Sequence, residues 1–238
     1  MSDKTFLWIE DRKRKAGYTF WSTFLEQLCP NIVLESKKNS SELVKAVKNL
    51  EDADHKYIVV LDDSFDNLQA VMERKLLKQY AEKKNHVILM DIICFEYILL
   101  EFEALIKWIY AADDEFLEKR AASIDAREKL VGCIQSGRLN YKELRELAAY
   151  DRYMNEHNIE QLAAKLLFDL TRNTGFEVSK GSIGDCWIKS CCEWQHRMKN
   201  DICGLDGGRL SVYEKMKHIY EGTSLKKQFE RIGAEVAV

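Results

Sequence analysis

The chain contains very little proline, has no long apolar run and carries no large excess of charge of either sign. Pro30 is the one proline in 238 residues, and this scarcity favours long helices with few irregular loops. The apolar runs all fall short of the roughly 20 residues that a membrane-spanning helix requires, so we expect no membrane partner. With 36 Lys and Arg against 39 Asp and Glu, the net charge is −3, so nucleic acid would have to bind to a local basic patch.

The seven cysteines are an odd number, and no signal-peptide pattern precedes the first apolar run after Met1–Lys4. We therefore expect a cytoplasmic, reducing setting in which the thiols are reduced or bind a metal. Hydrophobic residues make up 46% of the chain and aromatic residues 11%, which is enough for a packed core and argues against disorder.

Short apolar runs alternate with helical patterns through the N-terminal part of the chain. Buried strands are expected at Thr5–Ile9, Asn31–Leu34, Tyr57–Leu61 and Val87–Met90. Amphipathic helices are expected at Tyr18–Cys29, after the capping-box pattern Asn39-x-x-Glu42, and at Leu68–Lys83. Because alternating strands and helices form right-handed crossovers, the sequence predicts an open, mostly parallel Rossmann-like α/β sheet.

Beyond the fourth expected strand the pattern becomes helical. One long apolar stripe at helical spacing runs from Phe95 to Ile109. Further helical patterns follow at Asp113–Ile134, Tyr141–Asn155, Ile159–Thr171, Ser211–Tyr220 and Leu225–Ile232. The sequence thus predicts an α/β domain over residues 1–110 and a mainly helical domain over residues 111–238.

Acidic residues follow three of the four expected strands. In parallel sheets, ligands bind outside the carboxyl ends of the strands. Carboxylates gathered there repel one another, and a bound Mg²⁺ or Mn²⁺ offsets that repulsion and can activate water for phosphoester cleavage. The alternative is that the acids cap the helices that follow, or face solvent. The acids are Glu10 and Asp11 after the first strand, Asp62, Asp63 and Asp66 after the third, and Asp91 after the fourth.

A glutamate after the first strand and an acidic group after the third together resemble the TOPRIM family, which includes topoisomerases, primases and nucleases of bacterial anti-phage systems. The stretch Asp91–Leu100 (DIICFEYILL) is similar to the fourth strand and following helix of small TOPRIM-like defence proteins. The resemblance covers about residues 5–110 and implies a metal-dependent nuclease of DNA or RNA, with a possible protein partner in a defence system. It implies that Glu10 is the general base or is linked to the metal, and that Asp62 binds the metal. Glu96 is a further candidate ligand, with a residue on the polar face of an apolar helix as the alternative.

Two positions depart from the family's pattern. Ser64 stands where a second aspartate is expected, so Asp63, Asp66 and Asp91 are the candidates to complete the metal site. Asp11 replaces the glycine that often follows the glutamate. These departures leave open a non-catalytic TOPRIM-like domain that regulates or binds a protein partner.

The same strands also resemble a receiver domain of signalling proteins, in which Asp62 would accept a phosphoryl group. A receiver additionally requires a hydroxyl residue after the fourth strand and a lysine after a fifth. The fourth strand here leads into Asp91-Ile92-Ile93-Cys94, and no fifth strand ending in lysine is evident. The nuclease interpretation is therefore favoured.

Four consecutive basic residues follow Glu10 directly: Arg12, Lys13, Arg14 and Lys15. Positive charges beside an acidic metal site can hold a phosphate backbone, so these four are the candidate nucleic-acid contacts. Lys37 and Lys38 follow the second strand and can lie at the same edge. The alternative is a solvated basic loop.

A second cluster of chemistry-bearing residues comes late in the chain. Thiolates and imidazole are the ligands that zinc prefers, which makes this segment a candidate structural Zn²⁺ site. The spacing is not that of a standard zinc finger, and reduced core cysteines are the alternative. The residues are Cys186, Cys191, Cys192, His196 and Cys203.

Overall fold

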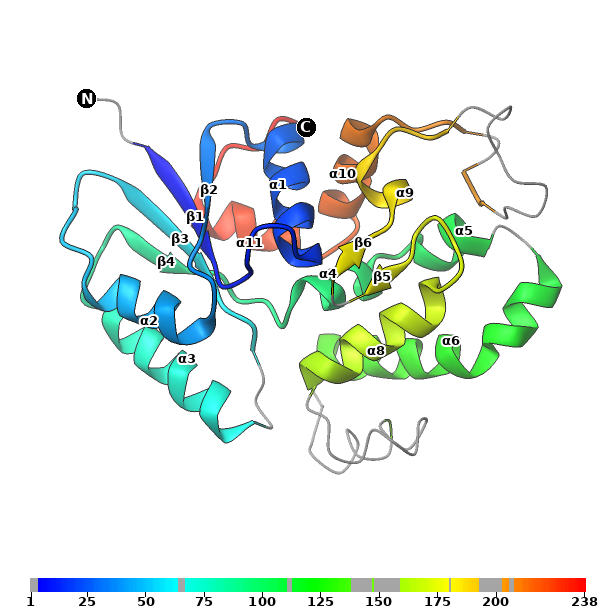
Figure 1. Cartoon of the computed structure of the whole chain (residues 1–238), viewed down its shortest axis with the longest axis horizontal. Helices are drawn as coiled ribbons and strands as arrows, with labels where there is room; N and C mark the ends of the chain where they lie inside the picture. The colour runs from blue at the N-terminus through cyan, green and yellow to red at the C-terminus, as the bar shows by residue number, and fades with distance from the viewer. Residues whose placement is uncertain are drawn as a thin grey trace.

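The computed structural model describes residues 4–63, 67–110, 113–137, 147, 159–179, 181–192, 203–205 and 208–238. Figure 1 shows the sheet and its flanking helices on one side of the molecule and the mainly helical remainder on the other. The mixed α/β fold class expected from the sequence is confirmed. None of the described helices is both long and apolar enough to cross a membrane.

Four parallel strands form the sheet, in the order β2-β1-β3-β4. They are β1 (Thr5–Ile9), β2 (Ile32–Ser36), β3 (Lys56–Val60) and β4 (Val87–Leu89). All four expected strands are present. The largest difference is in β2, which continues two residues beyond the expected Leu34.

The carboxyl ends of the two central strands are level with each other. Ile9 at the end of β1 pairs with Val60 of β3, and on its other side with Ser36 of β2. The chain leaves β1 toward β2 and then crosses back to β3 on the far side of β1. The point between β1 and β3 is therefore the topological switch point, where ligands bind in open α/β sheets.

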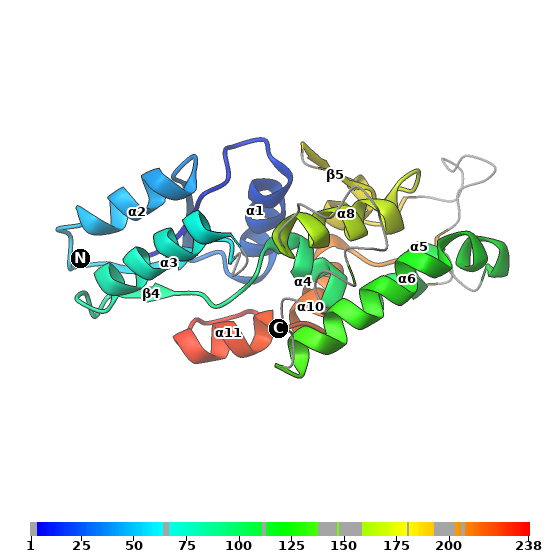
Figure 2. The same cartoon turned by 90° about the horizontal axis from the view of Figure 1, so that it is seen from below.

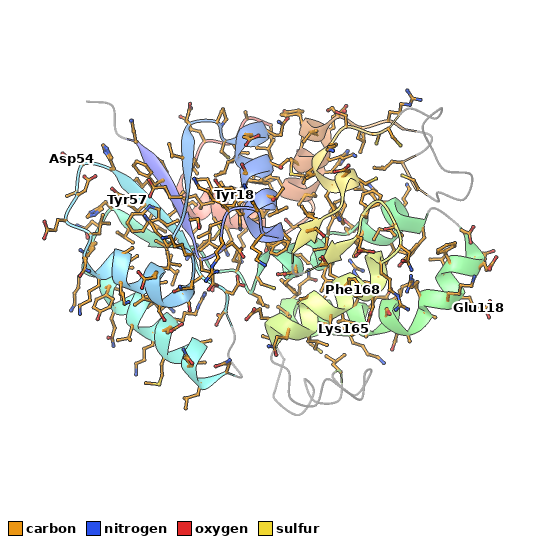
Figure 3. The ribbon with its side chains drawn as sticks, in the orientation of Figure 1. Tyr18, Asp54, Tyr57, Glu118, Lys165 and Phe168 are labelled. Carbon is orange, nitrogen blue, oxygen red and sulfur yellow. The ribbon has the colours of Figure 1, made fainter. Side chains whose placement is uncertain are left out.

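Helices cover both faces of this sheet (Figure 2). On one face α1 (Ala16–Leu28) packs against Leu7 and Ile9, while on the other α2 (Ser40–Lys48) and α3 (Leu68–Ala81) pack against Trp8. Side chains fill both layers (Figure 3): Tyr18 of α1 packs against the first core, and Tyr57 of β3 belongs to the second.

The helical part shares the core that lies on the α1 face of the sheet. It contains α4 (Phe95–Glu101), α5 (Leu105–Tyr110), α6 (Asp114–Gln135), α8 (Ile159–Thr171), α9 (Asp185–Ile188), α10 (Val212–Glu221) and α11 (Leu225–Ile232). A short hairpin joins β5 (Val178–Ser179) to β6 (Ser182–Ile183). The helix expected at Tyr141–Asn155 lies outside the described residues, apart from Leu147.

The single helical stripe expected from Phe95 to Ile109 is divided between α4 and α5. Phe102 breaks the helix with an extended ψ of 117°. Arg127 of α6 donates from Nε to the carbonyl of Leu100 at 2.7 Å and from a guanidinium NH₂ to that of Phe102 at 3.0 Å. Apolar periodicity did not reveal the break, because the carbonyls at the end of α4 are satisfied by a residue distant in sequence.

Candidate functional site

A cavity of about 510 Å³ opens at the carboxyl edge of the sheet. Glu10 reaches it from the end of β1 and Asp62 from the end of β3, at the switch point between the two strands. Glu73 of α3 and Glu160 of α8 line it as well, so four elements contribute a carboxylate. We refer to this space, defined by Glu10, Asp62, Glu73 and Glu160, as the acidic cavity.

Glu10 is a half-buried carboxyl in direct contact with the neighbouring strand. Its Oε1 accepts a hydrogen bond of 3.1 Å from the backbone N–H of Asp62. Burial raises the pKa of Glu10 to about 7, although this hydrogen bond lowers it, and the negative charges of Asp11, Glu160 and Glu73 raise it further. At neutral pH this group is therefore poised to accept or release a proton.

Asp62 lies in a still less favourable place for a negative charge. Burial raises the pKa of Asp62 well above its ordinary value, and the neighbouring charges of Glu10 and Glu96 raise it further. Within the described part of the chain, no cation and no hydrogen-bond donor contacts the Asp62 carboxylate. The pair Glu10–Asp62 is thus a half-buried acidic site with no cationic partner among the described residues.

The carboxylate of Asp11 lies against the first turn of α1, in the space that Gly17 leaves open because it has no side chain. A Cβ at Gly17 would lie 2.1 Å from Oδ2 of Asp11 and 3.0 Å from the ring of Phe95, so only glycine leaves room for this carboxylate. Burial raises the pKa of Asp11, while Lys15 lowers it. An acid near the first turn of a helix is favoured by the helix dipole, which accounts for an aspartate here.

Replacing Gly17 with alanine is expected to expel the Asp11 carboxylate from this position. The added methyl group overlaps a buried side chain, which destabilises a packed site by about 1–3 kcal/mol. Urea denaturation of Gly17→Ala measures the loss. The double variant Gly17→Ala, Asp11→Ala is expected to recover part of the stability, and no recovery would show that the Asp11 contact is not the cause.

Asp63 and Asp91 do not line the acidic cavity. Both form ion pairs with Arg74 of α3 instead. Nε of Arg74 lies 3.0 Å from Asp63, and a terminal guanidinium nitrogen lies 2.9 Å from Asp91. The other nitrogen donates to the carbonyl of Leu61 at 2.9 Å. Arg74 thus links the ends of β3 and β4 and forms ion pairs with both Asp63 and Asp91, which the sequence analysis gave as candidate metal ligands. Asp66, the remaining candidate, lies outside the described residues, as does Ser64.

Removal of the Arg74 guanidinium is expected to lower the free energy of unfolding, because Arg74 holds strand ends together and does not line the acidic cavity. Its side chain is 11% exposed, and Arg74→Ala leaves Asp63 and a carbonyl without their partner, a loss of about 2–4 kcal/mol. Asp91→Asn is the control, because that carboxylate is 72% exposed and an exposed pair contributes roughly 1 kcal/mol or less. Equal losses of unfolding free energy in the two variants would contradict this assignment.

Glu96 lies in the first turn of α4 and contributes to the same acidic environment. Burial raises the pKa of Glu96 to about 8, against the lowering effect of its own backbone N–H and of the Cys94 thiol. Glu96 does not line the acidic cavity. Its negative charge nevertheless raises the pKa of Asp62.

Basic side chains form the rim of the acidic cavity. Arg12, Lys15 and Lys38 line it, whereas Lys13 and Arg14 are exposed outside it. Arg14 and Lys38 have positive φ angles of 76° and 75°, a conformation that costs a non-glycine residue free energy and that concentrates at functional sites. Nε of Arg12 donates to the carbonyl of Lys38 at 3.4 Å, so the two basic loops are in contact.

The amino termini of two helices also lie at this rim. Lys15 precedes α1 as its N-cap without a side-chain cap, and Asn39 caps α2 by accepting from the N–H of Glu42 at 2.8 Å. Lys15 and Asn39 both line the acidic cavity. Helix amino termini carry partial positive charge, so the rim combines fixed dipoles with three cationic side chains.

The sequence did not identify Glu73 or Glu160 as site residues. Glu73 accepts from the hydroxyl of Ser41 at 2.9 Å. Burial acts to raise the pKa of Glu73, but hydrogen bonds from Ser40, Ser41 and Gln69 outweigh it, so that the pKa is lowered from its ordinary value. It lies within an amphipathic helix, where a half-buried acid has no distinctive signal. Glu160 comes from α8, far along the chain from the sheet, and local patterns could not have placed it at the strand ends.

The cysteine segment is described only in part, because His196 lies outside the described residues. Sγ of Cys191 accepts a hydrogen bond of 3.4 Å from the N–H of Leu210, and the side chain of Cys186 lies against Gly175. Cys192 is exposed, and Cys203 packs against the core. In the described ranges, no group of three or more His, Cys, Asp or Glu is arranged to hold a metal ion. Zinc binding by the whole segment remains a prediction.

Comparison with known proteins gives little guidance. No family model matches the chain, and no curated protein matches it. Among solved structures, the chain is similar to the C-terminal region of the Burkholderia pseudomallei OLD protein, with 11% sequence identity and a TM-score of 0.30. The likeness covers 93% of this chain and 98% of that one, but at this TM-score it carries no inference about the site.

Proposed function

We propose that this protein is a divalent-metal-dependent phosphodiesterase that cleaves nucleic acid. The observation that carries the proposal is the meeting of Glu10 and Asp62 at the switch point of a parallel sheet, in a cavity whose rim is basic. A phosphodiester needs both features, a site for cation and water at the scissile bond and positive groups for the flanking phosphate. Because the order of the acids resembles that of TOPRIM nucleases, anti-phage defence in bacteria is the setting we propose.

The donor set suits Mg²⁺ or Mn²⁺ bound largely by water. Mg²⁺ requires oxygen ligands and is commonly held by one or two carboxylates with several waters. Glu10 and Asp62 supply such carboxylates, and the raised pKa of each reflects a buried negative charge that a cation would offset. A cation there would activate water and stabilise the leaving oxygen. Asp63 and Asp91 are left out of this set, because both pair with Arg74 and neither lines the acidic cavity.

The protein's own residues are assigned to proton transfer and to phosphate binding. Glu10, whose pKa is about 7 in the metal-free protein, either binds the cation directly or takes the proton from a water that the cation binds. Arg12, Lys15 and Lys38 lie where they can bind the phosphate oxygens, and the amino termini of α1 and α2 add to the attraction. Glu160 and Glu73 also line the cavity.

A cleavage assay with a panel of substrates tests the proposal. Purified protein is incubated with single- and double-stranded DNA and RNA, with Mg²⁺ or Mn²⁺ and with EDTA. We expect cleavage of at least one substrate that requires the metal and stops with EDTA. Absence of cleavage from every substrate, in a preparation that calorimetry shows to bind neither metal, would overturn the proposal.

One observation favours a second function, that of a non-catalytic partner-binding protein. Among the described residues, no group of three or more potential ligands is arranged to hold a metal ion. This function predicts a stable complex with a protein partner and no turnover of nucleic acid. The receiver interpretation gains no such support, because the described parallel sheet has four strands and offers no lysine at the end of a fifth.

A further inference from the structure

A second hollow of about 370 Å³ adjoins the acidic cavity. Lys38 lines both spaces and forms the partition between them. The second hollow lies between the end of β2 and α2, and we define it by Lys37, Lys38, Glu42 and Lys45. Three of these four side chains are cationic, so the hollow favours an anion.

The partition between the two spaces is held in an uncommon backbone conformation. Lys38 is exposed and has a φ of 75°. Its N–H donates to Oγ of Ser36 at 3.3 Å, and its carbonyl accepts from Nε of Arg12 at 3.4 Å. These contacts hold the loop so that one cationic residue is presented to both spaces, which suits two neighbouring phosphates of one backbone.

Two lysines of the second hollow, Lys37 and Lys45, have acidic partners that an incoming phosphate would compete with. Nζ of Lys45 lies 2.7 Å from Glu42, with the two side chains 65% and 51% exposed. Exposed pairs of this kind contribute little to stability and are screened by salt. Lys37 is more firmly placed, with its Nζ 2.8 Å from Glu35 and 3.7 Å from the centre of the Trp8 ring. Lys45 is therefore the lysine that can most readily leave its acidic partner and pair with an incoming phosphate.

The second hollow is accessible from solvent. In the described sheet β2 is an edge strand, and the side chains of Lys38 and Lys45 that line this hollow are exposed, so a polymer that crosses Lys38 from the acidic cavity can extend beyond it. Each space has the volume of a pocket for one small ligand, which suits successive nucleotides of a single strand rather than a duplex.

We propose that a single nucleic-acid strand held in the acidic cavity continues across Lys38 into the second hollow, where Lys45 binds the next phosphate. This inference rests on the proposed function and specifies its substrate: a single strand that extends beyond the scissile bond toward the β2 edge. Binding energy gained in the second hollow raises affinity for longer strands and leaves the chemistry at Glu10 and Asp62 unchanged.

Fluorescence anisotropy with labelled oligothymidylates tests the inference without cleavage. A trinucleotide and a nonanucleotide are compared with the full-length protein, with Ca²⁺ in place of Mg²⁺ so that binding alone is measured. We expect the nonanucleotide to bind more tightly than the trinucleotide. We also expect a length-matched duplex to bind more weakly than the single strand.

Three substitutions on α2 assign the gain to the second hollow. Lys45→Ala is expected to lower affinity for the nonanucleotide by about threefold to tenfold, to flatten its dependence on salt by roughly 0.7 in log–log slope, and to spare the trinucleotide. Glu42→Gln is expected to strengthen nonanucleotide binding, because it releases Lys45 and removes a negative charge. Lys48→Ala is the matched control, since Lys48 is exposed on the same helix but lines neither space.

The outcomes separate this inference from the proposed function. Equal losses in Lys45→Ala and Lys48→Ala, no gain with length, or equal binding of the duplex would each overturn the route across Lys38. Metal-dependent cleavage observed alongside any of these results would leave the proposed function standing. A selective effect of Lys45→Ala without any cleavage would support a strand-binding surface and count against the phosphodiesterase.

Discussion

Glu10→Gln and Asp62→Asn are each expected to lower metal-dependent cleavage by about 10²- to 10⁴-fold, the range associated with loss of a positioned proton acceptor. Both substitutions keep the shape of the side chain and remove its negative charge. Glu10→Gln keeps an oxygen that can accept from the N–H of Asp62, so the contact between the strand ends survives. The loss of activity should therefore occur in a folded protein, which circular dichroism and thermal unfolding can verify.

Asp63→Asn is the matched control for these variants. Asp63 is the next residue in the chain and undergoes the same chemical change, but it pairs with Arg74 and does not line the acidic cavity. We expect this variant to lose some stability and to retain cleavage within about tenfold of wild type, since it removes no group that contacts the substrate. Full activity of Glu10→Gln would contradict the assignment of the site. Inactivity of Asp63→Asn as well as the other two variants would show that the loss of activity is not specific to Glu10 and Asp62.

The α/β layer was predictable because its signals are local. Leu7 and Ile9 face one helix layer and Trp8 the other, and such strands, buried on both faces, appear in sequence as continuous apolar runs. The break between α4 and α5 was not predictable. It depends on Arg127, a residue of α6 that satisfies carbonyls more than twenty positions earlier in the chain.

The site was predictable only where it is built from strand ends. Glu10 and Asp62 could be expected to meet, because the carboxyl ends of parallel strands share an edge. The same reasoning grouped Asp63 and Asp91 with them, since it could not anticipate that Arg74, in the middle of a helix, reaches both. Glu160 reaches the cavity from the helical part of the chain, so its position there depends on tertiary packing alone.

In metal-free protein, the free energy of unfolding is expected to fall as pH rises from about 5 to 8. The pKa of Glu10 is raised from 4.5 to about 7 in the folded protein, mainly by burial. Between these values the unfolded chain releases the proton while the folded chain retains it, so stability is highest below the unfolded pKa and is lost as pH rises through the folded pKa. A shift of this size corresponds to about 3 kcal/mol, and the raised pKa of Asp62 acts in the same direction.

Two comparisons connect this pH dependence to the proposed cation. Glu10→Gln has no proton to lose at this position, so its stability to urea should depend less on pH and should be higher than that of wild type at pH 8 in EDTA. Mg²⁺ should restore stability to wild type at pH 8, by about 2.7 kcal/mol at a hundredfold excess over its dissociation constant, and should have little effect at pH 5, where the carboxyls are protonated. Stability that rises between pH 5 and 8 without metal would show that Glu10 is not a buried, uncompensated acid. A Mg²⁺ effect of equal size in Glu10→Gln would place the cation elsewhere, because a site that depends on the Glu10 carboxylate must bind the ion more weakly once that charge is removed.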